Sequence, residues 1–226
     1  LLRRARGLKA PAVNAQAVKN AVTLPFAEGM KAEREYFLDL VSGEESKAQR
    51  HAFFAEREAA KVPGVTKDVK ARPINKMAVL GAGTMGGGIT MSFASAGIPV
   101  TIIDLNPEAL DRGMKIIEKN YRATQARGGL TEAQVDAALA NITPSSDFDA
   151  VADADMVIEA VFENMDLKKK IFKDLDAKCK PGCVLASNTS TLDVDEIAAV
   201  TSRPEDVLGM HFFSPANVMR LLEIVR

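Results

Sequence analysis

The sequence has no tryptophan, two tyrosines, two histidines and two cysteines among its 226 residues. Cys179 and Cys183 are too few for a disulfide framework or a four-cysteine metal site, so we expect reduced thiols and no bound metal. No apolar run approaches the roughly 20 residues that cross a bilayer, and we expect no membrane span. These scarcities exclude small disulfide-stabilised proteins and integral membrane proteins.

Neither sign of charge is in excess, because 29 lysines and arginines stand against 30 aspartates and glutamates. A nearly neutral chain lacks the basic surface that nucleic-acid binders use, which argues against nucleic acid as a partner. An apolar fraction of 47% with 26% charged residues is typical of a globular protein and excludes disordered, collagen-like and coiled-coil chains. The chain starts at Leu1 and ends in the strand-like LLEIVR, so we expect it to be part of a longer protein.

The pattern of apolar and polar residues changes near Lys76. Residues 1–62 space their apolar side chains as helices do, which predicts an α-helical appendage of two or three helices with too little apolar area for its own core. Residues 63–75, with prolines and a glycine, are typical of a linker. In residues 76–226 short apolar runs alternate with amphipathic stretches, which predicts βαβ units and a Rossmann-like, doubly wound α/β sheet.

The segment KMAVLGAGTMGGGI places Gly81, Gly83 and Gly86 in a G-x-G-x-x-G pattern between a predicted strand and a predicted helix. Gly81 would permit the tight turn, Gly83 the close approach of a pyrophosphate, and Gly86 the packing of helix on strand. Thr84 and Met85 lie inside the motif, and the helix begins there with unpaired N–H groups. Although glycine-rich turns are common, this context predicts a dinucleotide site.

Asp104 ends the second predicted strand, VTIID, 23 residues after Gly81. A carboxylate there can accept hydrogen bonds from the ribose hydroxyls and would repel a 2′-phosphate, which favours NAD over NADP. The alternative is an ordinary turn residue before Asn106 and Pro107.

His211 lies on the short apolar run MHFF, and Glu223 interrupts the strand LLEIV twelve residues later. A carboxylate among aliphatic residues is costly to bury unless it is paired. If the chain folds back near Pro215, Glu223 can meet His211 and orient the imidazole as a general base. A packed core histidine beside an edge-strand glutamate is the alternative.

The ordered blocks GAGTMGGGI, IID, IEAVFEN, ASNTS and HFFSPANVMRLLEIV resemble the L-3-hydroxyacyl-CoA dehydrogenases of fatty-acid β-oxidation over residues 75–226. The resemblance implies NAD-dependent oxidation of an L-3-hydroxyacyl-CoA, with His211 as base and Glu223 as its partner. It also implies that Glu163, Lys168, Ser190 and Ser214 contact the cofactor, and that Ser190 lies near the reacting oxygen of the substrate. Many members have asparagine in place of Ser214.

The residues themselves support these roles more weakly. Glu163 and Ser190 follow predicted strands, where ligands bind in open α/β sheets. Helix capping is the alternative for both, and for Ser190 the sequence favours the site over the cap. Lys168 otherwise belongs to a solvated helix face of three lysines. Arg127 could meet the phosphates of CoA, but its place on the predicted helix favours a solvated basic face. Glu159, inside its strand, is expected to be structural.

Residues 21–57 are similar to the end of the enoyl-CoA hydratase/isomerase half of multifunctional β-oxidation enzymes, so the parent would also have lyase and isomerase activity. By the same resemblance, the hydratase half and a C-terminal helical domain lie outside this chain, and the parent can form a homodimer. We expect a cytoplasmic bacterial enzyme or, alternatively, a peroxisomal one. We expect this chain to bind NAD with little or no turnover; a binding module without turnover and a dehydrogenase for small hydroxy acids are the alternatives.

Overall fold

The computed structural model describes residues 5, 7–66 and 68–226, and the chain divides into two compact units, Leu1–Ala71 and Arg72–Arg226. The boundary between them falls within the expected linker at residues 63–75. Each unit is described by itself below.

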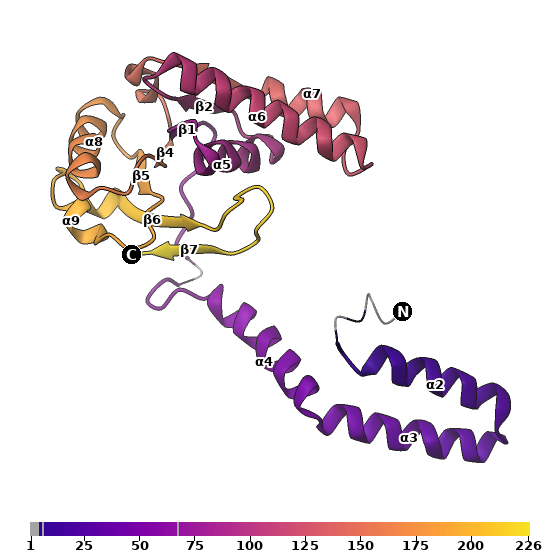
Figure 1. The fold of residues 1–226 in the computed structure, drawn as a ribbon. Coiled ribbons are helices and arrows are strands. Elements are labelled where there is room, and N and C mark those ends of the chain that lie inside the picture. Colours follow the sequence, from indigo (N-terminus) through magenta and orange to yellow (C-terminus); the bar gives the residue numbers. More distant parts are fainter. Residues whose placement is uncertain (1–4, 6, 67) are drawn as a thin grey trace. The chain divides into compact units, whose positions relative to one another are not determined.

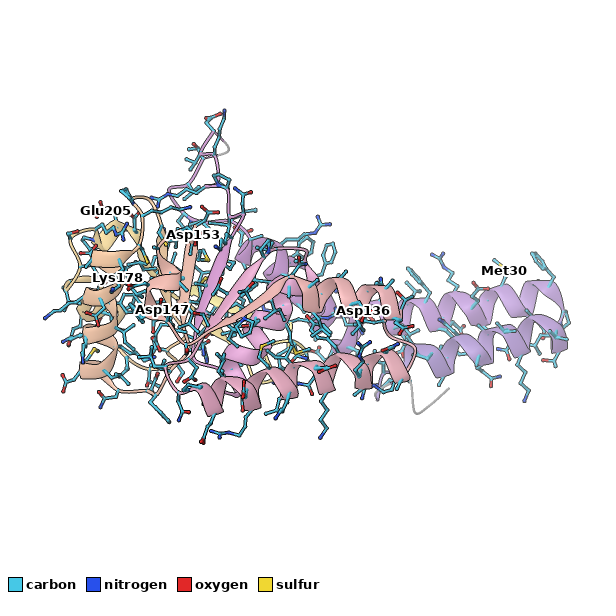
Figure 2. The ribbon with its side chains drawn as sticks, turned by 90° about the horizontal axis from the view of Figure 1, so that it is seen from above. Met30, Asp136, Asp147, Asp153, Lys178 and Glu205 are labelled. Carbon is cyan, nitrogen blue, oxygen red and sulfur yellow. The ribbon has the colours of Figure 1, made fainter. Side chains whose placement is uncertain are left out.

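The described part of the first unit contains three helices, α2 (Ala10–Thr23), α3 (Phe26–Ser42) and α4 (Glu44–Ala59). Helix α2 packs against α3, where the Asn20 amide donates a hydrogen bond to the Tyr36 hydroxyl at 3.2 Å. None of the three helices has a buried residue, and apolar side chains such as Phe26 are exposed. Met30, also exposed, is labelled in Figure 2. This part of the unit therefore has no core of its own, as its composition predicted.

The second unit is built on a seven-stranded sheet in the order β3-β2-β1-β4-β5-β6-β7. Strands β1 to β6 are parallel to one another, and β7 pairs antiparallel with β6 (Figure 1). Their bounds are β1 (Met77–Leu80), β2 (Val100–Ile103), β3 (Ile142–Ser145), β4 (Met156–Glu159), β5 (Val184–Ser187), β6 (Val207–Phe212) and β7 (Leu222–Val225).

Helices cover both faces of this sheet (Figure 1). They are α5 (Thr84–Ser95), α6 (Pro107–Ala126) and α7 (Glu132–Ala140) on one face, and α8 (Met165–Lys178) and α9 (Val194–Ala198) on the other, with short 3-10 turns at Phe148–Val151 and Pro204–Asp206. Alternate residues of β1 enter two separate cores: Met77 and Val79 pack toward α5, whereas Ala78 and Leu80 pack toward α8. The doubly wound α/β fold predicted from the sequence is confirmed.

One strand was not anticipated. The sequence of β3, ITPS, holds a proline and polar residues, which an edge strand tolerates because only one of its sides must pair. Charged side chains such as Asp147, Asp153 and Lys178 lie on the outside of the unit (Figure 2). Among the described residues, no helix combines the length and apolarity needed to cross a bilayer.

Candidate functional site

The sheet brings the predicted site residues to one edge. Strands β1, β4, β5 and β6 are parallel neighbours, so their carboxyl ends lie side by side. The chain order reverses between β1 and β4, and in open α/β sheets ligands bind at such a switch point.

The glycine-rich turn after β1 has two positions that accept no side chain. Gly81 has φ +99°, and a Cβ on it would lie 2.7 Å from the carbonyl oxygen of Ala160. A Cβ on Gly86 would lie 1.8 Å from the carbonyl oxygen of Gly81, so the turn and the first turn of α5 are in close contact. These two glycines are therefore required by the fold itself.

Gly83 differs from both. Its φ of −73° suits any residue, and a Cβ there would meet nothing within 4 Å. Gly83 is also the N-cap of α5, and no side chain caps that helix, so its first N–H groups face open space together with Thr84 and Met85. This uncapped, uncrowded helix start suits the pyrophosphate of a dinucleotide.

Asp104 lies directly after β2 and holds the turns beside it. One carboxylate oxygen accepts a hydrogen bond from the Ala82 N–H at 3.0 Å, and the other accepts from the Asn106 N–H at 3.0 Å. Asn106 in turn caps α6. Asp104 therefore fixes the glycine-rich turn, and each oxygen keeps a lone pair that a ribose hydroxyl could use.

Glu163 ties the loop after β4 to the loop after β5. Its Oε1 accepts hydrogen bonds from the Thr189 hydroxyl at 2.6 Å and the Ser190 N–H at 3.0 Å, and its Oε2 lies 3.3 Å from Lys168 Nζ. Burial raises the pKa of Glu163, but the two hydrogen bonds and the lysine charge outweigh it, so this pKa lies below the usual value. Glu163 is thus held as a carboxylate.

Lys168 is not part of a solvated face, and that interpretation was wrong for this residue. Its side chain is 0% exposed, and Nζ lies 2.8 Å from both carboxylate oxygens of Glu159, which is also 0% exposed. The helix α8 buries this lysine because it turns Lys168 toward the sheet together with Phe172 and Leu175. Lys168 does not line the pocket at this edge of the sheet, but its amine lies 3.3 Å from Glu163, which does. A direct contact between Lys168 and a cofactor stays a prediction.

His211 and Glu223 face each other across the last two strands. They are register partners in the antiparallel pair of β6 and β7, and His211 Nδ1 lies 2.8 Å from Glu223 Oε2. Because a carboxylate only accepts, a neutral imidazole in this pair donates its Nδ1–H to Glu223 and keeps its lone pair on Nε2. The imidazole is 22% exposed and the glutamate 52% exposed. The pairing expected from the sequence is present.

A pocket of about 360 Å³ lies against His211. Its lining includes Met85, Glu163, Asn188, Ser190 and Ser214, and the ring of Phe213 lies 4.6 Å from the imidazole. The pocket thus collects side chains from the ends of β4, β5 and β6 and from the start of α5. Arg127 is not among the residues that line it and lies at the C-terminal end of α6. Contact between Arg127 and a substrate remains a prediction.

Three residues of this edge were not among the predicted site residues. Glu159 accepts from Lys168, from the Ser187 hydroxyl at 2.7 Å and from the Val161 N–H at 2.8 Å. Thr189 is 5% exposed and bonds Glu163, and Asn188 lines the pocket. Glu159 carried the same signal as Glu223, a carboxylate inside an apolar strand, and this signal could have identified it.

The chain matches the family model described as 3-hydroxyacyl-CoA dehydrogenase, NAD binding domain, over residues 76–226. It is 43% identical over 227 residues to the peroxisomal bifunctional enzyme of Cavia porcellus, and 45% identical over 199 residues to the peroxisomal fatty acid beta-oxidation multifunctional protein AIM1 of Arabidopsis thaliana. These alignments cover 97% and 88% of the chain but 31% and 28% of the relatives, so the chain spans about a third of their length.

Solved structures agree with this assignment. The 3-hydroxybutyryl-CoA dehydrogenase of Escherichia coli K12 matches with a TM-score of 0.67 and 40% identity, over 68% of the chain and 32% of that structure. The dehydrogenase part of multifunctional enzyme 1 from C. elegans matches with a TM-score of 0.65 and 35% identity, over 73% and 38%. The chain therefore belongs to the 3-hydroxyacyl-CoA dehydrogenase family and carries its NAD-binding domain.

Proposed function

We propose that the protein containing this chain oxidises L-3-hydroxyacyl-CoA to 3-ketoacyl-CoA in fatty-acid β-oxidation, with NAD as the hydride acceptor. The observation that carries the proposal is the His211–Glu223 pair at 2.8 Å, which lies against the same pocket as Glu163 and Ser190. A structural nucleotide-binding domain has no need of an oriented imidazole with a free Nε2 beside its pocket.

The side chains have distinct parts in this reaction. His211 Nε2 would take the proton of the C3 hydroxyl. NAD, when bound, would supply the hydride acceptor that turns the alcohol into a ketone. Glu223 holds the imidazole by Nδ1–H and stabilises the positive charge that forms on it. Ser190 and Ser214 line the pocket, and their hydroxyl groups can donate hydrogen bonds there.

For the cofactor we propose NAD and not NADP. Gly81, Gly83 and Gly86 with Thr84 and Met85 would receive the pyrophosphate, and Asp104 the ribose hydroxyls. Calorimetric titration of the chain with each cofactor tests this proposal. We expect NAD to bind at least tenfold more tightly, and tighter binding of NADP would refute the assignment of Asp104.

For the chain by itself we propose NAD binding with weak turnover of acetoacetyl-CoA. Glu223 is half exposed, and water around the catalytic pair weakens the electrostatic stabilisation on which proton transfer depends. An absorbance assay at the NADH band measures this directly. Turnover as fast as that of the whole protein would contradict this proposal.

We further propose that the whole protein also has enoyl-CoA hydratase/isomerase activity, is active as a homodimer and lies in peroxisomes. The relatives named above are peroxisomal bifunctional and multifunctional enzymes, which favours peroxisomes over the expected cytoplasm. Enoyl-CoA hydration, sedimentation and co-localisation of the whole protein with a peroxisomal marker test the three parts separately. Diffuse fluorescence of a tagged whole protein would contradict the location.

A further inference from the structure

Asn188 links two strands at the point where their backbone pairing ends. The parallel pairing of β5 with β6 runs from Leu185↔Val207 to Ser187↔Gly209. One residue later, the side-chain oxygen Oδ1 of Asn188 accepts a hydrogen bond from the Phe212 N–H at 2.9 Å. The Asn188 side chain thus adds one hydrogen bond to β6 beyond the last residue of β5 that pairs through its backbone.

This attachment reaches the residue next to the proposed base. Beyond Gly209, the register partners of β6 are on β7 alone, where His211 faces Glu223 and Phe212 faces Leu222. The bond from Asn188 to the Phe212 N–H therefore holds the His211 segment on its β5 side. The other contacts of this hairpin are with α5, where the Phe93 ring packs on the Phe212 ring and the Ser92 hydroxyl donates to the Ala216 carbonyl oxygen at 3.3 Å. The Asn188 bond adds a fixed point on the β5 side.

Asn188 is itself firmly held. Its backbone N–H donates to the carbonyl oxygen of Glu159 at 2.8 Å. The preceding Ser187 donates from its hydroxyl to the Glu159 carboxylate at 2.7 Å, and both residues are fully buried. The anchor on which His211 depends is thus the buried end of β4 and β5, which also carries Glu163 and Ser190.

We propose that Asn188 is a positioning residue that sets where His211 stands relative to Glu163 and Ser190. The proposal rests on the function proposed above, because it concerns the placement of the base for that reaction. A displacement of about 1 Å between reacting groups can cost a hundredfold in rate, so a strand end held on one side only would impair proton transfer. The alternative is that Asn188 only shapes its loop, in which case its loss would change stability and leave His211 in place.

Three variants separate these roles. Asn188→Ala removes the acceptor for the Phe212 N–H. Asn188→Asp keeps an oxygen at that position. Asn141→Ala is the matched control, since the Asn141 amide also bonds a backbone group, the Ala94 carbonyl at 3.1 Å, far along the sheet from the pocket.

The readouts are the hydrogen-exchange rate of the Phe212 amide and the ring resonances of His211 in the isotope-labelled 226-residue chain, without substrate. We expect Asn188→Ala to speed exchange of the Phe212 amide about fivefold to tenfold, as the loss of one hydrogen bond allows, and to shift the His211 ring resonances. Asn188→Asp should keep slow exchange, and Asn141→Ala should leave both readouts unchanged.

Unchanged protection of the Phe212 amide in Asn188→Ala would overturn the proposal. Fast exchange of this amide in Asn188→Asp would also overturn it. The Asn188→Asp variant therefore tests the proposal even if Asn188→Ala does not fold. In the whole protein, Asn188→Ala should lower kcat at least tenfold with little change in KM for NAD. If the resonances behave as expected while the unsubstituted whole protein forms no NADH, the proposed function fails and the anchoring of His211 stands.

Discussion

At the scale of single residues, the three motif glycines have different reasons to be glycine. Gly81 and Gly86 leave no room for a Cβ within the protein, whereas Gly83 leaves room that no residue of the described ranges fills. Packing explains the first kind, and for the second we propose the pyrophosphate of a bound dinucleotide. The sequence pattern already predicted a different role for each of the three, but not the contacts behind those roles, because these depend on where the turn meets Ala160 and α5.

Substitution of these glycines separates folding from binding. We expect Gly83→Ala to fold with nearly unchanged thermal stability and to bind NAD at least tenfold more weakly, because its methyl group occupies the space for the pyrophosphate. Gly86→Ala should lower the melting temperature strongly, since the Cβ would lie 1.8 Å from a carbonyl oxygen. Melting curves with calorimetric titration measure both. Unweakened NAD binding by Gly83→Ala would place the pyrophosphate elsewhere.

The buried pair of Glu159 and Lys168 is the second residue-scale feature. Glu159→Gln leaves Lys168 buried with Glu163 as its remaining carboxylate partner, and we expect a loss of about 3 kcal/mol in the free energy of unfolding. The matched control is Glu196→Gln, which breaks a surface pair with Lys169 and should cost less than about 1 kcal/mol. Urea denaturation measures both free energies of unfolding. Equal losses in the two variants would contradict the claim that burial makes the Glu159–Lys168 pair cost more to break than the surface pair.

At the scale of elements, the site depends on loops that side chains join. Glu163 connects the loop after β4 to Thr189 and Ser190 after β5, and Asn188 connects β5 to β6. The sequence predicted most strands and helices, because buried parallel strands are apolar and their helices are amphipathic. It did not predict β3, whose proline and polar residues suit an edge, or the side-chain links, which depend on tertiary contacts.

The link made by Glu163 predicts a specific dependence on acid. Because its pKa is lowered in the folded state, Glu163 stabilises the fold above the usual carboxyl value of 4.5, and this contribution is lost as the pH falls through the folded pKa. Glu163→Gln should therefore be less stable than the parent sequence at neutral pH, and the difference should shrink below pH 4.5. Denaturation across this pH range measures it. A difference that stays constant with pH would show that the charge of Glu163 is not involved.

At the scale of the whole molecule, the chain consists of two units that differ in how many of their apolar side chains are buried. The second unit, Arg72–Arg226, contains both hydrophobic cores and every predicted site residue, whereas α2, α3 and α4 of the first unit have no buried residue. The sequence predicted this contrast from composition and periodicity, which need no tertiary information.

This division predicts that the second unit is sufficient for the cofactor. A protein of residues 72–226 should fold cooperatively and bind NAD with the affinity of the 226-residue chain, within a factor of about two. Calorimetry on the two proteins compares them. A large loss of affinity in the shorter protein would mean that residues 1–71 contribute to the site.

The most direct measurement is a crystal structure of the chain with NAD bound. We predict that the pyrophosphate lies at Gly83 and the start of α5, and that the nicotinamide enters the pocket with C4 facing His211, leaving room between them for one hydroxyl-bearing carbon. A nicotinamide ring ordered away from His211, with the imidazole and Glu223 still paired, would contradict the assignment of this pair to the oxidation of the C3 hydroxyl.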